Sequence, residues 1–192
     1  MDVEIRPLTA ETWDALNDLF DAGGDAKSCS CQFWRRPING WGREAAAQNR
    51  AALRAQAEET LPPGLVAFRD GVAVGWVAVA PRDGYPRLTR SRTIPQLPGD
   101  DVWAISCFVV RRTARGAGVA ASLLDAAVAF AREHGAGVVE GYPVDTGGAR
   151  LPAGSAYTGT RGMFDRSGFT EAAPTTSRPK PGMTRVVMRR EP

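Results

Sequence analysis

A basic, glycine-containing turn near the middle of the chain joins an apolar, strand-like run to an amphipathic, helix-like run. The turn spans residues 111–120, the apolar run 103–110 and the helical pattern 122–134. Glycines let a backbone turn tightly and approach a ligand closely. The free N–H groups and the positive dipole end of the helix then face that ligand. The turn therefore predicts an anion site, with a phosphate or pyrophosphate as its natural guest.

The composition of the chain is typical of a soluble globular protein. Its 192 residues are 43% hydrophobic and 23% charged, which suits a single domain over residues 1–192. Net charge is +3, and only Lys27 and Lys180 among the 24 cations are lysines. Arginine favours forked contacts to phosphate or carboxylate, although a compositional bias toward arginine explains the excess equally well.

Membrane and secretory signals are not evident in the sequence. No apolar run approaches the length of a membrane-spanning helix, and the first nine residues lack a basic region followed by an apolar one. Three cysteines are an odd count, which argues against a disulfide scaffold. We therefore expect a cytoplasmic protein with no membrane partner.

Hydrophobic periodicity and turn residues predict helices that alternate with strands. Strands are expected at residues 3–8, 65–69, 72–80, 102–110, 138–144 and 184–190, and helices at 10–21, 43–60, 122–134 and 158–167. Asp70-Gly71 indicates a tight hairpin, and the strand at 102–110 is apolar enough to be buried on both faces. A long irregular segment, 81–100, carries four arginines and four prolines. The order predicts an α/β fold.

The turn resembles a known family signature. Arg115-x-x-Gly118-x-Ala120 is similar to the Gln/Arg-x-x-Gly-x-Gly/Ala signature of the GNAT superfamily of acyl-CoA-dependent acetyltransferases, and Gly168-Phe169 resembles the Gly-Phe that ends the family's last helix. The element order is also similar, over roughly residues 2–190. The resemblance implies a mixed, mostly antiparallel central sheet with splayed middle strands, flanked by helices.

The same resemblance implies acetyl-CoA (coenzyme A) as the acyl donor. Backbone amides of the turn, with Arg115 and Arg112, would hold the pyrophosphate, and the end of the central strand would pair with the pantetheine arm. The N–H of Phe108 or Val109 would donate to the oxyanion that develops when a neutral amine attacks the thioester. The residues assigned to coenzyme A are Phe108, Val109, Val110, Arg112, Arg115, Gly116, Ala117, Gly118, Val119 and Ala120.

Two positions that carry acid–base residues in many family members lack them here. The tyrosine four residues before the Gly-Phe glycine is replaced by Phe164, and a glutamate of the central strand is replaced by Ala104. Tyr157 is the nearest substitute for the proton donor, and Tyr142 is another. A structural or substrate-contacting phenol is the competing interpretation of Tyr157.

The sequence offers several candidates for the general base. Glu140 is a candidate because burial between apolar neighbours would raise its pKa toward neutrality. Asp100 and Asp101 are the other carboxylates available, and Ser106 is a candidate to orient a water molecule. A solvated or salt-bridged Glu140 is the alternative.

Aromatic residues and arginines gather in the segment after the first helix, where they could stack on a ring or clamp an anionic substituent. The residues expected to contact the acceptor are Trp34, Arg35, Trp103 and Tyr142. The arginines of segment 81–100 are expected either at the 3′-phosphate of coenzyme A or at an acidic acceptor, with a solvated loop as the alternative.

A metal site is not expected. Cys29, Cys31, Cys107 and His134 are potential ligands, but their spacing is not that of a zinc site, and the cysteines are interpreted as small core residues. His134 is interpreted as a cation at a helix carboxyl end.

The predicted function is transfer of an acetyl group from acetyl-CoA to a primary amine of a small molecule. Phe164 and Ala104 keep open a non-catalytic acyl-CoA-binding or regulatory module, and a protein N-acetyltransferase is a third hypothesis. No nucleic-acid partner is expected, because no basic stripe with interleaved aromatics occurs. Pairing of edge strands into a homodimer is an expectation of the resemblance alone.

Overall fold

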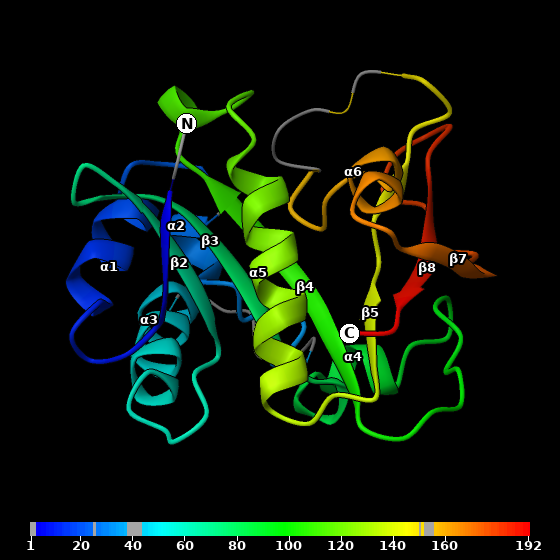
Figure 1. Cartoon of the computed structure of the whole chain (residues 1–192), viewed down its shortest axis with the longest axis horizontal. Helices are drawn as coiled ribbons and strands as arrows, with labels where there is room; N and C mark the ends of the chain where they lie inside the picture. Colours follow the sequence, from blue (N-terminus) through cyan, green and yellow to red (C-terminus); the bar gives the residue numbers. More distant parts are fainter. Residues whose placement is uncertain (1–2, 25, 38–43, 150, 152–155) are drawn as a thin grey trace.

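The computed structural model places helices on both faces of a central sheet (Figure 1). It describes residues 3–24, 26–37, 44–149, 151 and 156–192. In this part of the chain the strands are β1 Glu4–Pro7, β2 Gly64–Arg69, β3 Val72–Pro81, β4 Val102–Val110, β5 Val138–Gly141, β6 Val144–Asp145, β7 Thr170–Pro174 and β8 Thr184–Arg190. The helices are α1 Trp13–Asp21, α2 Ala26–Cys29, α3 Ala45–Gln56, α4 Pro86–Thr89, α5 Val119–Glu133 and α6 Arg161–Arg166, with 3-10 turns at Arg82–Gly84 and Arg112–Ala114.

The sheet is mixed and mostly antiparallel, as predicted. Strands β1 to β4 pair with their neighbours in chain order, β5 runs parallel to β4, and β8 runs antiparallel to β5. β8 also pairs with β6 and, along its other edge, with β7. The predicted hairpin between β2 and β3 is confirmed, because Asp70 and Gly71 both have positive φ, as such a tight turn requires.

The two middle strands diverge, as the family resemblance implies. Parallel pairing of β4 with β5 runs from Val102 opposite Val138 to Ile105 opposite Gly141 and stops there, although β4 continues to Val110. After Gly141 the chain continues as β6, which pairs with β8 and not with β4. A side chain at Gly141 would overlap the ring of Phe164, so glycine is needed where the strands part. Among the described residues, the second half of β4 therefore has no strand partner on this edge.

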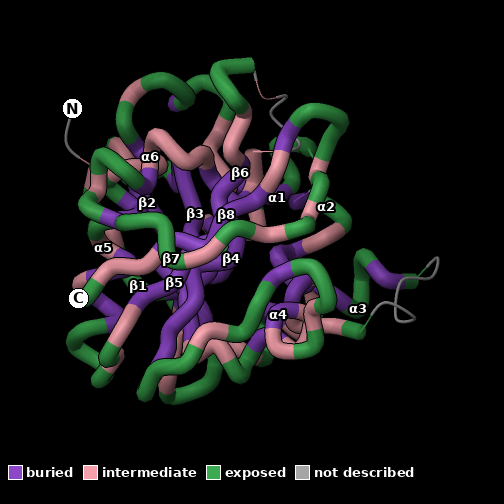
Figure 2. The backbone as a smooth tube through the Cα atoms, turned by 90° about the vertical axis from the view of Figure 1, so that its right-hand side faces the viewer, coloured by how far each residue is buried: buried purple, intermediate pink, exposed green. Residues whose placement is uncertain are grey.

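Alternating side chains of the strands supply a core to each face of the sheet. Val77 and Ile105 face α5, where they pack with Leu123, and Figure 1 shows this helix crossing the near face. Trp76 faces the opposite side and packs with Phe20 of α1. Figure 2 shows the buried residues concentrated in the strands, between more exposed helices and loops. None of the helices in the described residues is long and apolar enough to cross a membrane.

Several boundaries differ from the sequence-based expectation. α5 begins at Val119, three residues earlier than predicted, because Gly118 takes the left-handed conformation just before it. Segment 81–100 contains α4 and a 3-10 turn rather than irregular chain alone. β7 was not predicted, because its sequence Thr-Glu-Ala-Ala-Pro has no apolar alternation and its pairing comes from β8. The predicted start of the second helix, residue 43, lies outside the described residues.

Candidate functional site

Two adjoining cavities lie near the middle of the sheet, and the first is lined by the open edge of β4. The first has a volume of about 1000 Å³ and is lined by the end of β4, the glycine turn and the segment around Cys29. The second, of about 930 Å³, is lined by α4, the chain that follows it, and Arg185 of β8. Phe33, Trp34 and Tyr157 line both cavities, so these three side chains form a shared wall.

The glycine turn forms one end of the first cavity. Gly116 and Gly118 have φ values of 76° and 80°, and nothing lies within 4 Å of a Cβ built on either residue. α5 starts directly after Gly118 without a side-chain cap, so its first N–H groups are not covered by a capping side chain. Arg115 and Ala120 line the cavity beside this helix start. The geometry suits an anion at the amino end of α5.

The open edge of β4 presents backbone groups to the first cavity. The N–H of Phe108 donates to the carbonyl of Tyr157 over 2.5 Å, and the carbonyl of Val110 accepts from Nε of Arg115 over 3.2 Å. Backbone groups alternate along a strand, so Val109, which is paired with Trp76, points its N–H toward β3. Of the two oxyanion donors predicted, Val109 is therefore unsuitable, and the N–H of Phe108 has an internal partner here.

Tyr157 lies in the wall between the two cavities. Its hydroxyl accepts a hydrogen bond from Nη2 of Arg185 over 3.1 Å. Burial raises the pKa of Tyr157, an effect that the positive charge of Arg185 opposes. The phenol therefore keeps its proton near neutral pH and can donate it.

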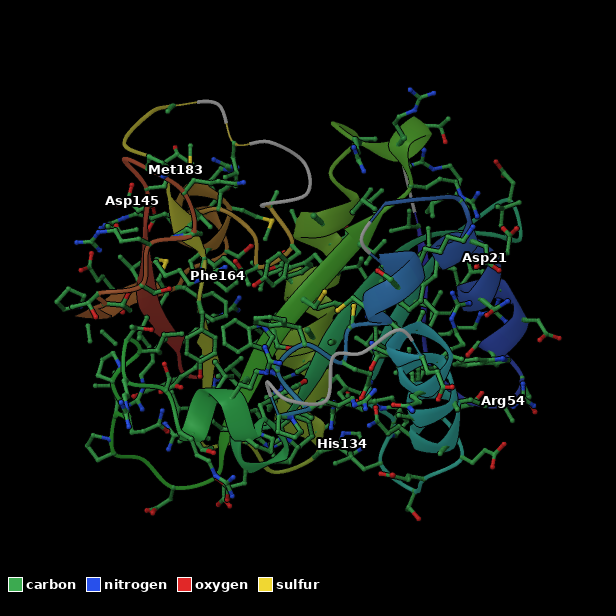
Figure 3. All side chains as sticks on the ribbon, turned by 180° about the vertical axis from the view of Figure 1, so that it is seen from behind. Asp21, Arg54, His134, Asp145, Phe164 and Met183 are labelled. Atoms are coloured by element: carbon green, nitrogen blue, oxygen red, sulfur yellow. The ribbon has the colours of Figure 1, made fainter. Side chains whose placement is uncertain are left out.

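The two positions that lack acid–base residues are apolar core. Phe164 is fully buried, with its ring 4.9 Å from that of Phe169 and 6.3 Å from that of Phe108, and Figure 3 labels it in the interior. Ala104 is also fully buried and packs near α4. Neither residue lines a cavity.

Glu140 is buried in an ion-pair network rather than in a cavity. Its carboxylate lies 3.2 Å from Arg82 and 2.6 Å from Arg189, and it accepts a hydrogen bond of 2.6 Å from the hydroxyl of Tyr142. The carboxylate is thus enclosed by two guanidinium groups and a phenol, and it lines neither cavity. This arrangement matches the salt-bridged alternative and does not fit the predicted general base.

Two further residues predicted at the site are also internal. Tyr142 is buried, and desolvation together with the charge of Glu140 raises its pKa well above the usual value. Ser106 is fully buried on β4. Neither lines either cavity, so they do not meet Tyr157 at a common reacting centre.

The four residues predicted to contact the acceptor are dispersed. Trp34 lies in the shared wall, whereas Arg35 stacks over the ring of Tyr85 at 4.6 Å and lines neither cavity. Trp103 is buried against α5, with its ring 6.0 Å from both Phe130 and His134. It packs in the core on the α5 side of the sheet and lines neither cavity, so it does not fit the predicted contact.

The cysteines gather beside the first cavity. The sulfurs of Cys31 and Cys107 lie 2.8 Å apart as free thiols, and Cys29 lines the same cavity. Among the described residues no group of three His, Cys, Asp or Glu side chains is placed to hold a metal ion. His134 lies at the far end of α5 (Figure 3), where its Nδ1 is 2.8 Å from the carbonyl of Phe130.

Arg185 was not singled out from the sequence, although it is buried beside Tyr157 and lines the second cavity. The signal that could have found it is its place in the last strand, Thr-Arg-Val-Val-Met-Arg-Arg, where an arginine precedes the apolar run. Arg87, Arg90 and Arg92 line the second cavity rather than the first, which places them on the side away from the glycine turn.

Comparison with known proteins identifies one matching family and solved structures of similar fold. The profile of the acetyltransferase (GNAT) family matches residues 28–147. A search of curated proteins found no match. Among solved structures, an N-acetyltransferase from Staphylococcus aureus Mu50 aligns with a TM-score of 0.59 at 14% identity, over 100% of this chain and 99% of that one.

Two other structures show how varied the similar proteins are. A candidate phosphinothricin N-acetyltransferase aligns with a TM-score of 0.54 at 16% identity, over 99% of this chain and 98% of its own. The ribosomal-protein-S18-alanine N-acetyltransferase from Escherichia coli aligns with a TM-score of 0.50 at 13% identity, over 99% of this chain and 94% of its own. At these identities the likeness concerns the fold, whereas the family profile spans more than half of the sequence. The chain therefore belongs to the GNAT family of acetyltransferases.

Proposed function

We propose that the protein transfers an acetyl group from acetyl-CoA directly to a primary amine of a small molecule. The observation that carries the proposal is the shared wall of Phe33, Trp34 and Tyr157 between two cavities of about 1000 and 930 Å³. Both volumes lie near the upper end of the range for small-molecule sites. Two substrates can thus be held at once, one on each side of the phenol.

The first cavity fits the donor. Acetyl-CoA would supply the acetyl thioester. Gly116 and Gly118 expose the backbone of residues 116–120 at the start of α5, where the pyrophosphate would be held together with Arg115. The edge of β4 that faces away from β3 would align the pantetheine arm through the groups of Phe108 and Val110 that the bonds to Tyr157 and Arg115 leave over, the carbonyl of Phe108 and the N–H of Val110. Arg112 is exposed beside the turn and does not line the cavity, so its contribution is long-range attraction.

Tyr157 is the proposed general acid. Its phenol holds a proton at Oη near neutral pH and lies in the wall through which donor and acceptor would meet. No acidic side chain lines either cavity among the described residues, so a water molecule is the proposed proton acceptor for the amine. The arginines around the second cavity favour the neutral amine over its ammonium form.

The first test measures donor binding by calorimetry with coenzyme A, using a matched pair of glycine variants. Gly118→Ala and Gly182→Ala place the same strain on a left-handed residue, with φ values of 80° and 74° and open space around both. We expect Gly118→Ala to weaken coenzyme A binding about tenfold, because it distorts the start of α5, and Gly182→Ala to leave it unchanged.

The second test measures thiol release from acetyl-CoA with a panel of small primary amines and one peptide with a free amino terminus. Release with small amines supports the proposal. Coenzyme A binding without release on any amine would indicate the non-catalytic acyl-CoA-binding module, and release with the peptide alone would indicate a protein N-acetyltransferase. Absence of coenzyme A binding by the unmodified protein would contradict the proposal as a whole.

A further inference from the structure

The second cavity is strongly cationic. Arg87, Arg90, Arg92 and Arg185 line it, and none of its described lining residues is acidic. Phe33 and Trp34 form an aromatic wall, with ring centroids 5.0 Å apart. A cavity that combines several fixed positive charges with an apolar wall favours a ligand that is both anionic and apolar.

Arg185 is the most informative of these residues, because it is a buried cation without a counter-ion. Only 4% of its surface is exposed. Its guanidinium donates to the carbonyl of Tyr142, the hydroxyl of Thr158 and the hydroxyl of Tyr157, all of which are neutral acceptors. No carboxylate lies within ion-pair distance in the part of the chain that the structure describes.

The lack of a counter-ion distinguishes Arg185 from the buried arginines that pair with Glu140. Arg82 and Arg189 are also largely buried, but both form an ion pair with the carboxylate of Glu140. Burying an unpaired charge is unfavourable, and burial lowers the pKa of Arg185. An anionic ligand in the second cavity would supply the missing counter-ion.

The arginines at the other side of the cavity are of two kinds. Arg87 is fixed, because its Nε donates to the carbonyl of Arg36 over 2.7 Å and its guanidinium lies 4.3 Å above the ring of Phe33. Arg90 and Arg92 are exposed and make no ion pair with any described residue. They can turn toward a ligand with little loss of existing contacts.

The shared wall contains a hydrogen-bond donor without an acceptor. Trp34 is 7% exposed, and its Nε1 is buried without a hydrogen-bond partner among the described residues. A buried N–H without an acceptor is unfavourable, so an oxygen of a ligand would improve its environment. Arg185 lies near this indole, 5.9 Å from the ring centre.

From this geometry we propose that the acceptor is a small amine that carries a carboxylate, as an amino acid does, together with an apolar group. The proposal rests on the proposed function, because it assigns the second cavity to the acceptor. Arg185 contacts Tyr157, so a carboxylate bound to Arg185 lies near the reacting end of the cavity. The amine and the carboxylate are therefore close together in the acceptor, and the apolar group lies along Phe33 and Trp34.

The proposal is tested first by binding alone, with coenzyme A present to fill the first cavity. Phenylacetate is compared with phenylacetamide, its neutral counterpart, by NMR saturation-transfer titration. We expect phenylacetate to bind at least about fivefold more tightly, since forked arginine contacts need the charge. The Arg90→Ala/Arg92→Ala double variant should lose part of this preference, because it removes two of the four arginines that line the cavity. Both residues are exposed, so their removal leaves the fold intact. Arg132→Ala, an exposed arginine on α5, is the matched control and should bind as the unmodified protein does.

Turnover provides the second measurement. L-Phenylalanine, L-methionine and L-leucine are each compared with their amides in the thiol-release assay. The amides have the less basic amine, so a larger fraction of it is neutral and reactive, and they are the better acceptors intrinsically. A kcat/KM about tenfold higher for the acids would therefore show that the enzyme recognises the carboxylate. Arg185→Lys should keep more of the preference than Arg185→Gln, provided that thermal melting shows both variants folded.

Each outcome decides the proposal. Equal binding of phenylacetate and phenylacetamide overturns it, whatever the turnover. Acetylation of amines with no preference for acids also overturns it, while the proposed function stands. If the double variant binds coenzyme A more weakly but binds 3′-dephospho-coenzyme A normally, the arginines serve the donor, and the proposal is wrong. Charge-dependent binding without any turnover supports the anion site and contradicts only the proposed catalysis.

Discussion

Tyr157 and Tyr142 place the same phenol in two different environments. Tyr157 lies in the wall between the two cavities, whereas Tyr142 is buried against Glu140. Tyr157→Phe should lower kcat about 10- to 100-fold with little change in the KM for acetyl-CoA, because the ring remains and the proton is lost. Steady-state kinetics measure both parameters.

Tyr142→Phe is the matched control for this prediction. It removes a hydrogen bond to a charged carboxylate, so the free energy of unfolding should fall by about 1.5–3 kcal/mol, while kcat stays within about twofold. Urea unfolding and the same kinetic assay check the two values. An unchanged kcat in Tyr157→Phe would remove Tyr157 as the general acid.

Cys29 carries a testable pH dependence. Burial, together with the nearby Cys31, raises its pKa from 9.0 to about 11. Alkylation of Cys29 by iodoacetamide, followed by peptide mass spectrometry, should therefore accelerate up to about pH 11. A rate that levels off below pH 9.0 would contradict this shift. The same shift makes the folded state less stable as pH rises between 9.0 and about 11, because the unfolded chain loses its proton first.

Residues that act through local backbone conformation were easier to predict from the sequence than residues that act through ion pairs with distant side chains. Arg115 and Ala120 line the first cavity, and Gly118 between them has the positive φ that lets α5 begin there, because glycine content and order determine a turn locally. Glu140 was ambiguous, because its partners come from distant parts of the chain: Arg82 is 58 residues away and Arg189 is 49. Sequence alone shows a carboxylate but not the guanidinium groups that neutralise it.

At the scale of elements, the Glu140 network joins three parts of the fold. Glu140 lies on β5, Arg189 on β8 and Arg82 in the 3-10 turn after β3. Glu140→Gln should lower the free energy of unfolding by about 3 kcal/mol, because it leaves two largely buried arginines without their carboxylate. Urea denaturation measures the loss.

Asp165→Asn is the control for the stability measurement on Glu140→Gln, because it removes the charge of a carboxylate that is exposed. Asp165 is about half exposed and lies 4.0 Å from Arg161, so its neutralisation should change stability by less than about 0.5 kcal/mol. If Glu140→Gln instead left stability intact and abolished turnover, Glu140 would be the base after all.

Elements with their own hydrophobic pattern were predicted well. β3 and β4 lie within one residue of the expected ranges, because each has a long apolar run. β8 also matches its expected range, although its apolar run is only Val-Val-Met. The short elements were missed, since α4 spans only four residues and β7 has no apolar alternation of its own. Such segments acquire their structure from tertiary contacts, which local propensity does not report.

At the scale of the whole molecule, the shared wall predicts the kinetic mechanism. Because both cavities can be filled together, we expect intersecting lines in double-reciprocal plots of initial rate against the two substrates. Parallel lines would indicate a covalent acyl-enzyme, for which Cys29 and Cys107 in the first cavity would be the nucleophiles to test. A single domain over residues 1–192 likewise remains a prediction, which coincident unfolding transitions by fluorescence and circular dichroism would support.

The hydrogen bond from Phe108 to the carbonyl of Tyr157 has an evolutionary consequence. A hydrogen bond between main-chain groups does not depend on which side chain the residue carries. The backbone at position 157 would therefore be held beside β4 with any side chain at this position. One codon change could then exchange the phenol for an imidazole or a thiol without rebuilding the surrounding fold. Relatives of this chain could thus differ in their proton donor while sharing the same scaffold, and position 157 is the natural first site for directed evolution of a new pH optimum.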